Sequence, residues 1–167
     1  MSKALLIAAI AAFCVFLWNT PAHCQSSDSI NIRVAANVIK SIELVTIRNM
    51  RVDNVQPGQK EIALSPVTDS GAGKMIARGT PGAQIRVSYF EEWQLNNGRS
   101  SSLTFRYRLA GNAENKQNTA ELLLPDNRGL RFNKDGEFFF WVGGRVNIEN
   151  AQPGTYEGEF TIEIEYI

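Results

Sequence analysis

Hydrophobic and polar residues alternate along most of this chain. The last stretch, GTYEGEFTIEIEY at residues 154–166, places aromatic and β-branched residues at even positions and glutamates at odd positions. Successive side chains of a strand point to opposite faces, so a period of two is typical of a strand with one buried face. The chain is therefore expected to end on such a strand, with its glutamates in solvent.

The same alternation recurs in earlier segments. Strands with one solvated face are predicted at 30–38, 85–89 and 103–109. The segments 41–47 and 137–142 carry apolar residues on both parities, as strands that are bulged or covered on both sides do. On the polar face of 103–109, Arg106 and Arg108 are expected to pair across a sheet with the glutamates of the last strand.

Turn sequences rich in Gly, Pro and Asn separate these segments, for example TPG at 80–82 and QPG at 152–154. The polar stretch 111–120 is predicted to be a mobile loop, and NKDGE at 133–137 a hairpin turn. No window has the 3.6-residue period of an amphipathic helix. These features predict an all-β fold, an immunoglobulin-like antiparallel β-sandwich.

The N-terminus has the pattern of a secretory signal peptide. Lys3 precedes an apolar run from Ala4 to Trp18 that is shorter than the ~18 residues of a membrane-spanning helix. Small residues at Ala22 and Cys24 predict cleavage after Cys24, so that 1–24 is the signal peptide and 25–167 a single domain. A membrane anchor is one alternative, and a lipoprotein acylated at Cys24 is another, although His23 before the cysteine disfavours it.

Cleavage of the signal peptide would remove every thiol and the only imidazole. Both cysteines and the single histidine lie in the first 24 residues, which excludes Ser–His and Cys–His nucleophilic pairs from the remaining chain. We therefore predict a protein that is not an enzyme and holds no cofactor or metal. Loss of Lys3 leaves 16 basic against 17 acidic residues, a balance that gives no electrostatic basis for binding nucleic acid.

Two segments carry a resemblance to a known family. VGGRVNIENAQPGTYEGEFTIEIEY at 142–166 and, less closely, ARGTPGAQIRVSY at 77–89 resemble the signature of exported bacterial domains of unknown function from Bacteroidetes, Chlorobi and Proteobacteria. That family is distantly similar to pilus subunits secreted by the chaperone–usher route. The resemblance implies a Gram-negative source, a fimbria-like role at the cell surface, and a periplasmic chaperone as a partner.

Two features of the chain match such subunits. A glycine lies fourteen residues from the end and a tyrosine is penultimate, as in the segment that a chaperone grips, and an alternating apolar segment near the new N-terminus resembles a donor strand. An incomplete sandwich exposes an edge that a neighbour's strand can complete. A self-complete domain and a strand-exchanged one both remain open. The candidate strand-pairing residues are Ile30, Ile32, Val34, Ala36, Val38, Gly154, Phe160, Ile162, Ile164 and Tyr166.

The predicted function is that of a non-catalytic structural protein, secreted or at the cell surface, which is fimbria-like or adhesive and associates with itself or other proteins by strand pairing. Its expected location is the periplasm, the cell surface or the extracellular space. The alternative is a soluble secreted module that binds carbohydrate or another ligand. That module would use Tyr89, Phe90 and Trp93, since aromatic rings stack on sugars.

Overall fold

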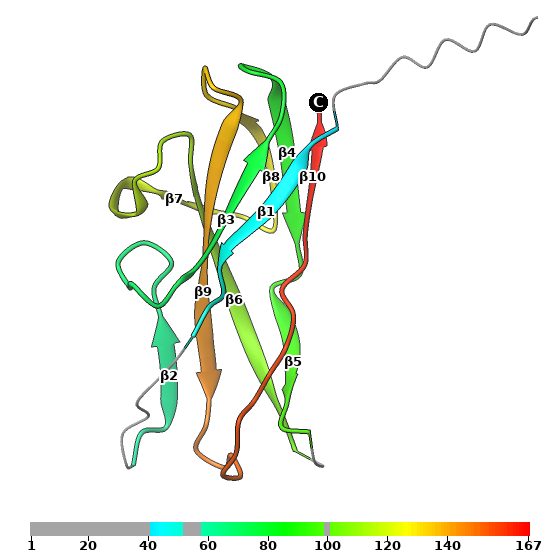
Figure 1. Cartoon of the computed structure of the whole chain (residues 1–167). Coiled ribbons are helices and arrows are strands. Elements are labelled where there is room, and N and C mark those ends of the chain that lie inside the picture. The colour runs from blue at the N-terminus through cyan, green and yellow to red at the C-terminus, as the bar shows by residue number, and fades with distance from the viewer. Residues whose placement is uncertain (1–40, 52–57, 99–100) are drawn as a thin grey trace, which may run out of the picture. The chain divides into compact units, whose positions relative to one another are not determined.

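The computed structural model describes residues 41–51, 58–98 and 101–167 (Figure 1). All of them belong to one compact unit, Val38–Ile167. The predicted signal peptide at 1–24 and the predicted strand at 30–38 lie outside the described residues.

The described residues form two antiparallel sheets. The larger sheet has the order β1-β3-β9-β6-β5, with β2 paired to β9 and β7 paired to β6, and the smaller sheet has the order β10-β4-β8. One short 3₁₀ helix, η1, spans Gln117–Thr119. The strands are β1 Glu43–Arg48, β2 Glu61–Leu64, β3 Gly73–Arg78, β4 Gln84–Tyr89, β5 Glu92–Asn96, β6 Ser102–Asn112, β7 Glu121–Leu123, β8 Asp126–Arg131, β9 Glu137–Asn147 and β10 Ile162–Tyr166.

The core lies between the inner faces of the two sheets. Ile85 and Val87 of β4 are fully buried against Phe105 and Leu109 of β6 and Phe140 of β9. Their alternation in the sequence sends one set of side chains inward from each strand. The predicted all-β antiparallel sandwich is confirmed.

A second apolar cluster lies on the outer face of the larger sheet. Trp141 of β9 is opposite Ala110 of β6, and both are buried together with Phe139. Ala120, which follows η1, is buried in this cluster, and the side-chain amide of Gln117 donates hydrogen bonds to the carbonyl oxygens of Pro66 (3.0 Å) and Asp69 (2.8 Å). The polar stretch 111–120, predicted as a mobile loop, is therefore part of the cover that buries β9 on both faces.

The neighbour of β9 changes along its length. β3 pairs with β9 up to Val142, and β2 pairs with it from Gly144 onward. The chain leaving β2 crosses directly over Gly143, where a Cβ atom would collide with the carbonyl oxygen of Leu64. Glycine is required at this position because the two backbones approach too closely for a side chain.

Two predicted details differ in the structure. The turn at 133–137 is tight, with Gly136 donating its N–H to the Asn133 carbonyl (3.0 Å), but it links β8 of the smaller sheet to β9 of the larger one and closes no hairpin. The terminal strand begins only at Ile162, and before it Glu157 forms a single bridge with Asn96. Alternation alone does not report which sheet a strand joins, so neither difference was visible in the sequence.

The core should depend strongly on its central aromatic residue. Phe140→Ala is expected to lower the free energy of unfolding by about 3–5 kcal/mol, because Phe140 is completely buried and its loss leaves a cavity. Phe90→Ala is the matched control, since Phe90 is 70% exposed, and it should change stability by less than about 0.5 kcal/mol. Urea unfolding at low protein concentration measures both, and equal effects would contradict this assignment of the core.

Candidate strand-pairing site

The sandwich has one side on which each sheet ends in an edge strand. β1 ends the larger sheet and β10 ends the smaller one, and no described residue pairs with the outer edge of either strand (Figure 1). We call these two outer edges the open side. Unpaired edges present rows of free N–H and C=O groups, which makes the open side the first candidate site.

The hydrogen bonds of β10 alternate between its two edges. Beyond the strand, Ile167 donates its N–H to the carbonyl of Gln84 (3.2 Å), and hydrogen-bonded pairs recur at every second residue of an antiparallel ladder. Glu163 and Glu165 are therefore the residues bonded to β4. The backbone groups of Ile162, Ile164 and Tyr166 consequently point to the open side.

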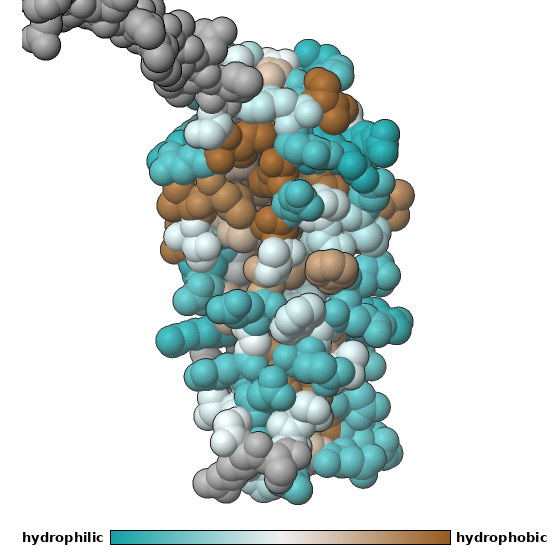
Figure 2. Space-filling model, turned by 90° about the vertical axis from the view of Figure 1, so that its right-hand side faces the viewer, coloured by the Kyte–Doolittle hydropathy of each residue, from teal (hydrophilic) through white to brown (hydrophobic). Residues whose placement is uncertain are grey.

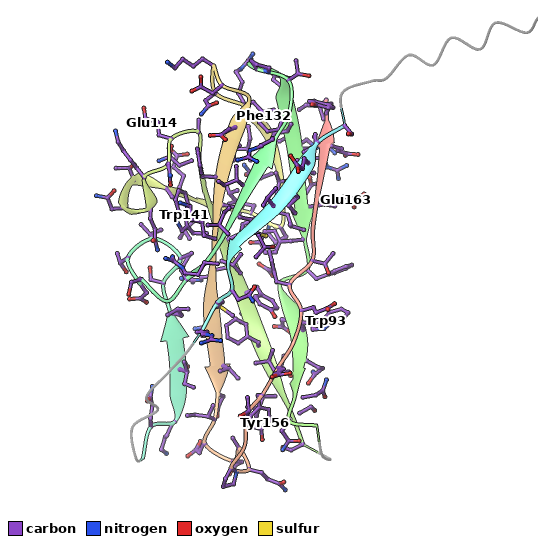
Figure 3. All side chains as sticks on the ribbon, viewed as in Figure 1. Trp93, Glu114, Phe132, Trp141, Tyr156 and Glu163 are labelled. Carbon is purple, nitrogen blue, oxygen red and sulfur yellow. The ribbon has the colours of Figure 1, made fainter. Side chains whose placement is uncertain are left out.

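The side chains of these same three residues point inward. Ile162, Ile164 and Tyr166 are partly buried and pack against the core, whereas Glu163 and Glu165 are exposed, and Glu163 points away from the sandwich in Figure 3. The predicted alternation of the last strand is thus confirmed for 162–166. A strand added here would bond to residues whose side chains already belong to the core.

β1 contributes an apolar side chain that the sandwich leaves uncovered. Leu44 is opposite Ala77, a core residue of β3, so it lies on the inner face of the larger sheet, yet it is 39% exposed. Figure 2 shows hydrophobic residues gathered on the upper part of the face that includes β10. The sequence indicated this strand through its apolar residues on both parities, and of the two expected explanations, a bulge or cover on both faces, the strand has a shift of register between Thr46 and Arg48. It did not indicate that the strand would lie at an edge.

Aromatic side chains fix the C-terminal segment at two points. Phe160 packs between Tyr89 and Tyr107, with ring centroids at 5.7 and 4.8 Å. The Tyr166 hydroxyl accepts a hydrogen bond from the Thr80 N–H (2.9 Å), and its ring lies 6.2 Å from that of Phe132. These contacts hold β10 in place although the described strands bond to only one of its edges.

Arg86 of β4 ties both neighbouring strands of the smaller sheet together on its outer face. Its guanidinium donates to Asp126 of β8 (2.6 and 3.0 Å) and to Glu165 of β10 (2.8 Å). The hydrogen bonds from Arg86 lower the pKa of Asp126, and the charge of Arg128 adds to that effect. The expected pairing of Arg106 with the terminal glutamates is wrong, because Arg106 binds Glu92 on its neighbour β5 (2.8 Å).

The three residues proposed for ligand binding separate in the structure. Tyr89 is turned toward the protein, where its hydroxyl donates to the Leu123 carbonyl (2.9 Å), and burial together with the charge of Glu91 raises its pKa. Phe90 and Trp93 are 70% and 51% exposed, and their ring centroids are 6.4 Å apart. Trp93 is labelled in Figure 3, beside the segment that leads into β10.

The Phe90–Trp93 pair borders a small hollow of about 90 Å³. Tyr107, Glu159, Phe160 and Thr161 line the rest of it. This hollow lies where the chain passes from β4 to β5 and changes sheets. Sequence reasoning missed its other members, because Tyr107 lies on β6 and Glu159 to Thr161 immediately precede β10.

The remaining predicted residues have different positions. Gly154 lies in an exposed bend before the terminal strand and not on β10. The proposed donor residues 30–38 are outside the described residues. Within the described ranges, no group of three or more His, Cys, Asp or Glu side chains is placed to hold a metal ion, and no helix is long and apolar enough to cross a membrane.

Comparison with known proteins identifies a family. The model of a family described as Domain of unknown function (DUF4402) matches residues 45–166, which include every strand from β2 to β10 and most of β1. No curated protein matches the chain. The expectation of an unknown-function domain family is confirmed.

The contact between Arg86 and Asp126 should be measurable through the pKa of Asp126. A carboxylate with a lowered folded pKa stabilises the protein above its unfolded value of about 3.9, and that contribution is lost as the pH falls through the folded value. Arg86→Gln should return the Asp126 pKa toward about 3.9, whereas Arg128→Gln should move it less, because Arg128 lies 3.9 Å away without a hydrogen bond. A ¹³C NMR titration of the side-chain carboxyl measures both, and equal shifts would contradict the ranking.

Proposed function

The chain belongs to the DUF4402 family of domains of unknown function, and we propose that it is a non-catalytic structural protein that associates by β-strand addition at the open side. It is exported to the periplasm, the cell surface or the medium, where it forms part of a fimbria-like or adhesive assembly. Its partners are further copies or other proteins with an extended apolar segment. A periplasmic chaperone that holds the same edge before assembly belongs to this proposal.

One observation carries the proposal. Ile162, Ile164 and Tyr166 direct their backbone N–H and C=O groups to an edge that no described residue pairs with, while Leu44 leaves apolar surface exposed on the inner face of the opposite sheet. An added strand would therefore satisfy backbone groups and cover apolar side chains together. This combination is the physical basis of strand addition in peptide recognition.

The proposed occupant is the segment Ile30–Val38 of another copy. Its apolar residues share one parity, as those of a strand inserted against a core must. Full burial of its four large side chains and Ala36 would contribute on the order of 6–12 kcal/mol before the cost of ordering the segment. That gross value is comparable with the whole stability of a domain, about 5–15 kcal/mol, so such an exchange can hold an assembly together.

Strand direction separates a self-complete form from an exchanged one. β1 and β10 run antiparallel to each other, because β5 is parallel to β1 through the ladders of the larger sheet and the C-terminal segment is antiparallel to β5. If Ile30–Val38 folded back on its own β1 as a hairpin, it would run parallel to β10. A segment from another copy has no such restriction and can form the antiparallel ladder with β10, which is slightly more stable per residue.

Removal of the donor segment 30–38 and obstruction of the open side that accepts it should both prevent assembly. We expect the purified exported protein to form ladders of multimers that resist mild detergent on a gel. Deletion of 30–38 should abolish them, and so should Leu44→Lys, which puts a charge on the inner face where the added strand would pack. Since Leu44 is already 39% exposed, Leu44→Lys should change the free energy of unfolding by about 1 kcal/mol or less.

Glu43→Lys is the matched control for the acceptor. Glu43 precedes Leu44 on the same strand, is exposed, and points to the other face of the sheet. The Glu43→Lys variant should therefore give the same ladder of multimers on a gel as the unmodified protein. Ladders that survive deletion of 30–38 would remove that segment as the donor. A protein that stays strictly monomeric at high concentration would refute the assembly proposal as a whole.

Carbohydrate binding is a second candidate function, favoured by the exposed Phe90–Trp93 pair. Two neighbouring rings with open faces are the surface on which a sugar stacks. The hollow beside them is smaller than the roughly 300–1,000 Å³ of typical ligand pockets, and Tyr89 is turned inward, so the sugar would bind only on the surface.

A glycan array tests this second function. Binding to a defined glycan that is lost in Trp93→Ala and retained in Tyr89→Phe would support it, because Tyr89 faces the protein while Trp93 is exposed. An array without signal would reject carbohydrate binding at this surface.

A further inference from the structure

We infer that the hollow beside Phe90 and Trp93 is a binding site for a quaternary ammonium group, such as the head group of choline. Four of the six residues that line it are aromatic, Phe90, Trp93, Tyr107 and Phe160, and the remaining two are Glu159 and Thr161. Aromatic rings gathered around a small space are the arrangement by which proteins hold such cations, and Glu159 adds a negatively charged residue to the lining.

The rings have the exposure that this role needs. Tyr107 is 3% exposed and Phe160 is partly buried, so these two form a fixed floor, joined by ring centroids 4.8 Å apart. Phe90 and Trp93 stand at the rim, 70% and 51% exposed, with an angle of 34° between their planes. A cation is attracted to ring faces because the π system concentrates negative charge there.

Charge and size favour a cation over a neutral ligand. Glu159 is exposed and makes no ion pair with any described residue, so its carboxylate is available to a positively charged ligand. The volume of about 90 Å³ suits a head group and is too small to enclose a drug-sized molecule or a sugar ring.

The lining also distinguishes between kinds of ammonium ion. A lysine ammonium carries three N–H donors, each of which needs an acceptor when it leaves water. The side chains that line the hollow are mostly aromatic, and their acceptors are the Glu159 carboxylate and the hydroxyls of Thr161 and Tyr107, the last of which already donates to the Glu159 carbonyl (3.4 Å). A quaternary ammonium has no N–H group and loses no hydrogen bond on entering, so it needs none of these acceptors and suits a lining in which four of six residues are aromatic.

The same protein already places an ammonium over two aromatic rings. On the outer face of the larger sheet, the Nζ atom of Lys74 lies 5.7 Å from the ring centroid of Phe139 and 5.8 Å from that of Trp141. Both distances are within the roughly 6 Å at which cations and rings attract. There the cation is supplied by the chain itself, whereas at the hollow it would come from a ligand.

Titration of the exported protein with choline chloride tests the site, using the change in tryptophan fluorescence as the signal, since Trp93 is exposed at the hollow while Trp141 is buried elsewhere. Saturable binding is expected, and 3,3-dimethylbutanol, the uncharged isostere of choline, should bind at least about tenfold more weakly because it lacks the charge. Equal binding of the isostere, or no binding of choline at all, would overturn the inference. So would tighter binding of Nα-acetyl-lysine amide, which would assign the site to a primary ammonium, or equal binding of neutral monosaccharides.

Variants locate the binding. Trp93→Ala should weaken choline binding about tenfold or more and Trp93→Phe much less, read by ¹⁵N NMR because the fluorophore is changed. Glu159→Gln should weaken binding of choline without affecting its isostere, whereas Glu157→Gln, an exposed carboxylate in the same segment but outside the hollow, should have no effect. Identical results for Glu159→Gln and Glu157→Gln would contradict the assigned role of Glu159.

A further arm identifies the source of the ligand. Sedimentation with phosphatidylcholine vesicles, compared with vesicles of phosphatidylglycerol, shows whether the site accepts the choline of a lipid surface or only free choline. Either result supports a quaternary ammonium site, since both ligands carry the same group. These measurements do not depend on strand exchange, because the protein without 30–38 keeps all six lining residues and can be titrated in the same way.

Discussion

The antiparallel pairing of the C-terminal segment with β4 and β5 is the interaction on which the rest of the unit depends. The segment bonds first to Asn96 through Glu157 and then to the whole of β4 through β10. Phe160 anchors it between these contacts, and Tyr166 anchors its end. Because the outer edge of β10 is unpaired in the described residues, this one ladder both closes the core and defines the open side.

The penultimate tyrosine explains why two distant stretches of sequence belong together. The Tyr166 hydroxyl bonds to Thr80 in the turn between β3 and β4, and a Cβ atom at Gly79 would lie 2.6 Å from that hydroxyl oxygen. Any side chain at position 79 would therefore displace the Tyr166 side chain from this hydrogen bond and weaken the attachment of the end of β10. The Gly-x-Pro-Gly turn and the penultimate tyrosine therefore contact each other directly.

Much of the fold followed from alternation, and its failures have a common cause. The alternation of apolar and polar residues in β4, β6 and β10 correctly predicted which side chains lie inward, such as Val87, Leu109 and Ile164. Alternation shows on which face of a sheet a side chain lies, but not which strands or side chains lie beside it. It could not show that β9 exchanges β3 for β2 at Gly143, that Arg106 would meet Glu92, or that Leu44 would lie at an edge. The candidate sites depend on such neighbours, so the sequence predicted the β10 residues of the open side and Phe90, Trp93 and Phe160 of the hollow, but not the residues that meet them.

The two proposed sites share a stretch of chain, and that sharing limits how both can be used. Thr161 lines the aromatic hollow, and the free edge of β10 begins at the next residue, Ile162. A strand that pairs only with Ile162–Tyr166 leaves the hollow open. The segment Ile30–Val38 is longer than β10, so it must extend either past Tyr166 or across Thr161. The register of the added strand therefore decides whether an assembled copy can still bind a cation.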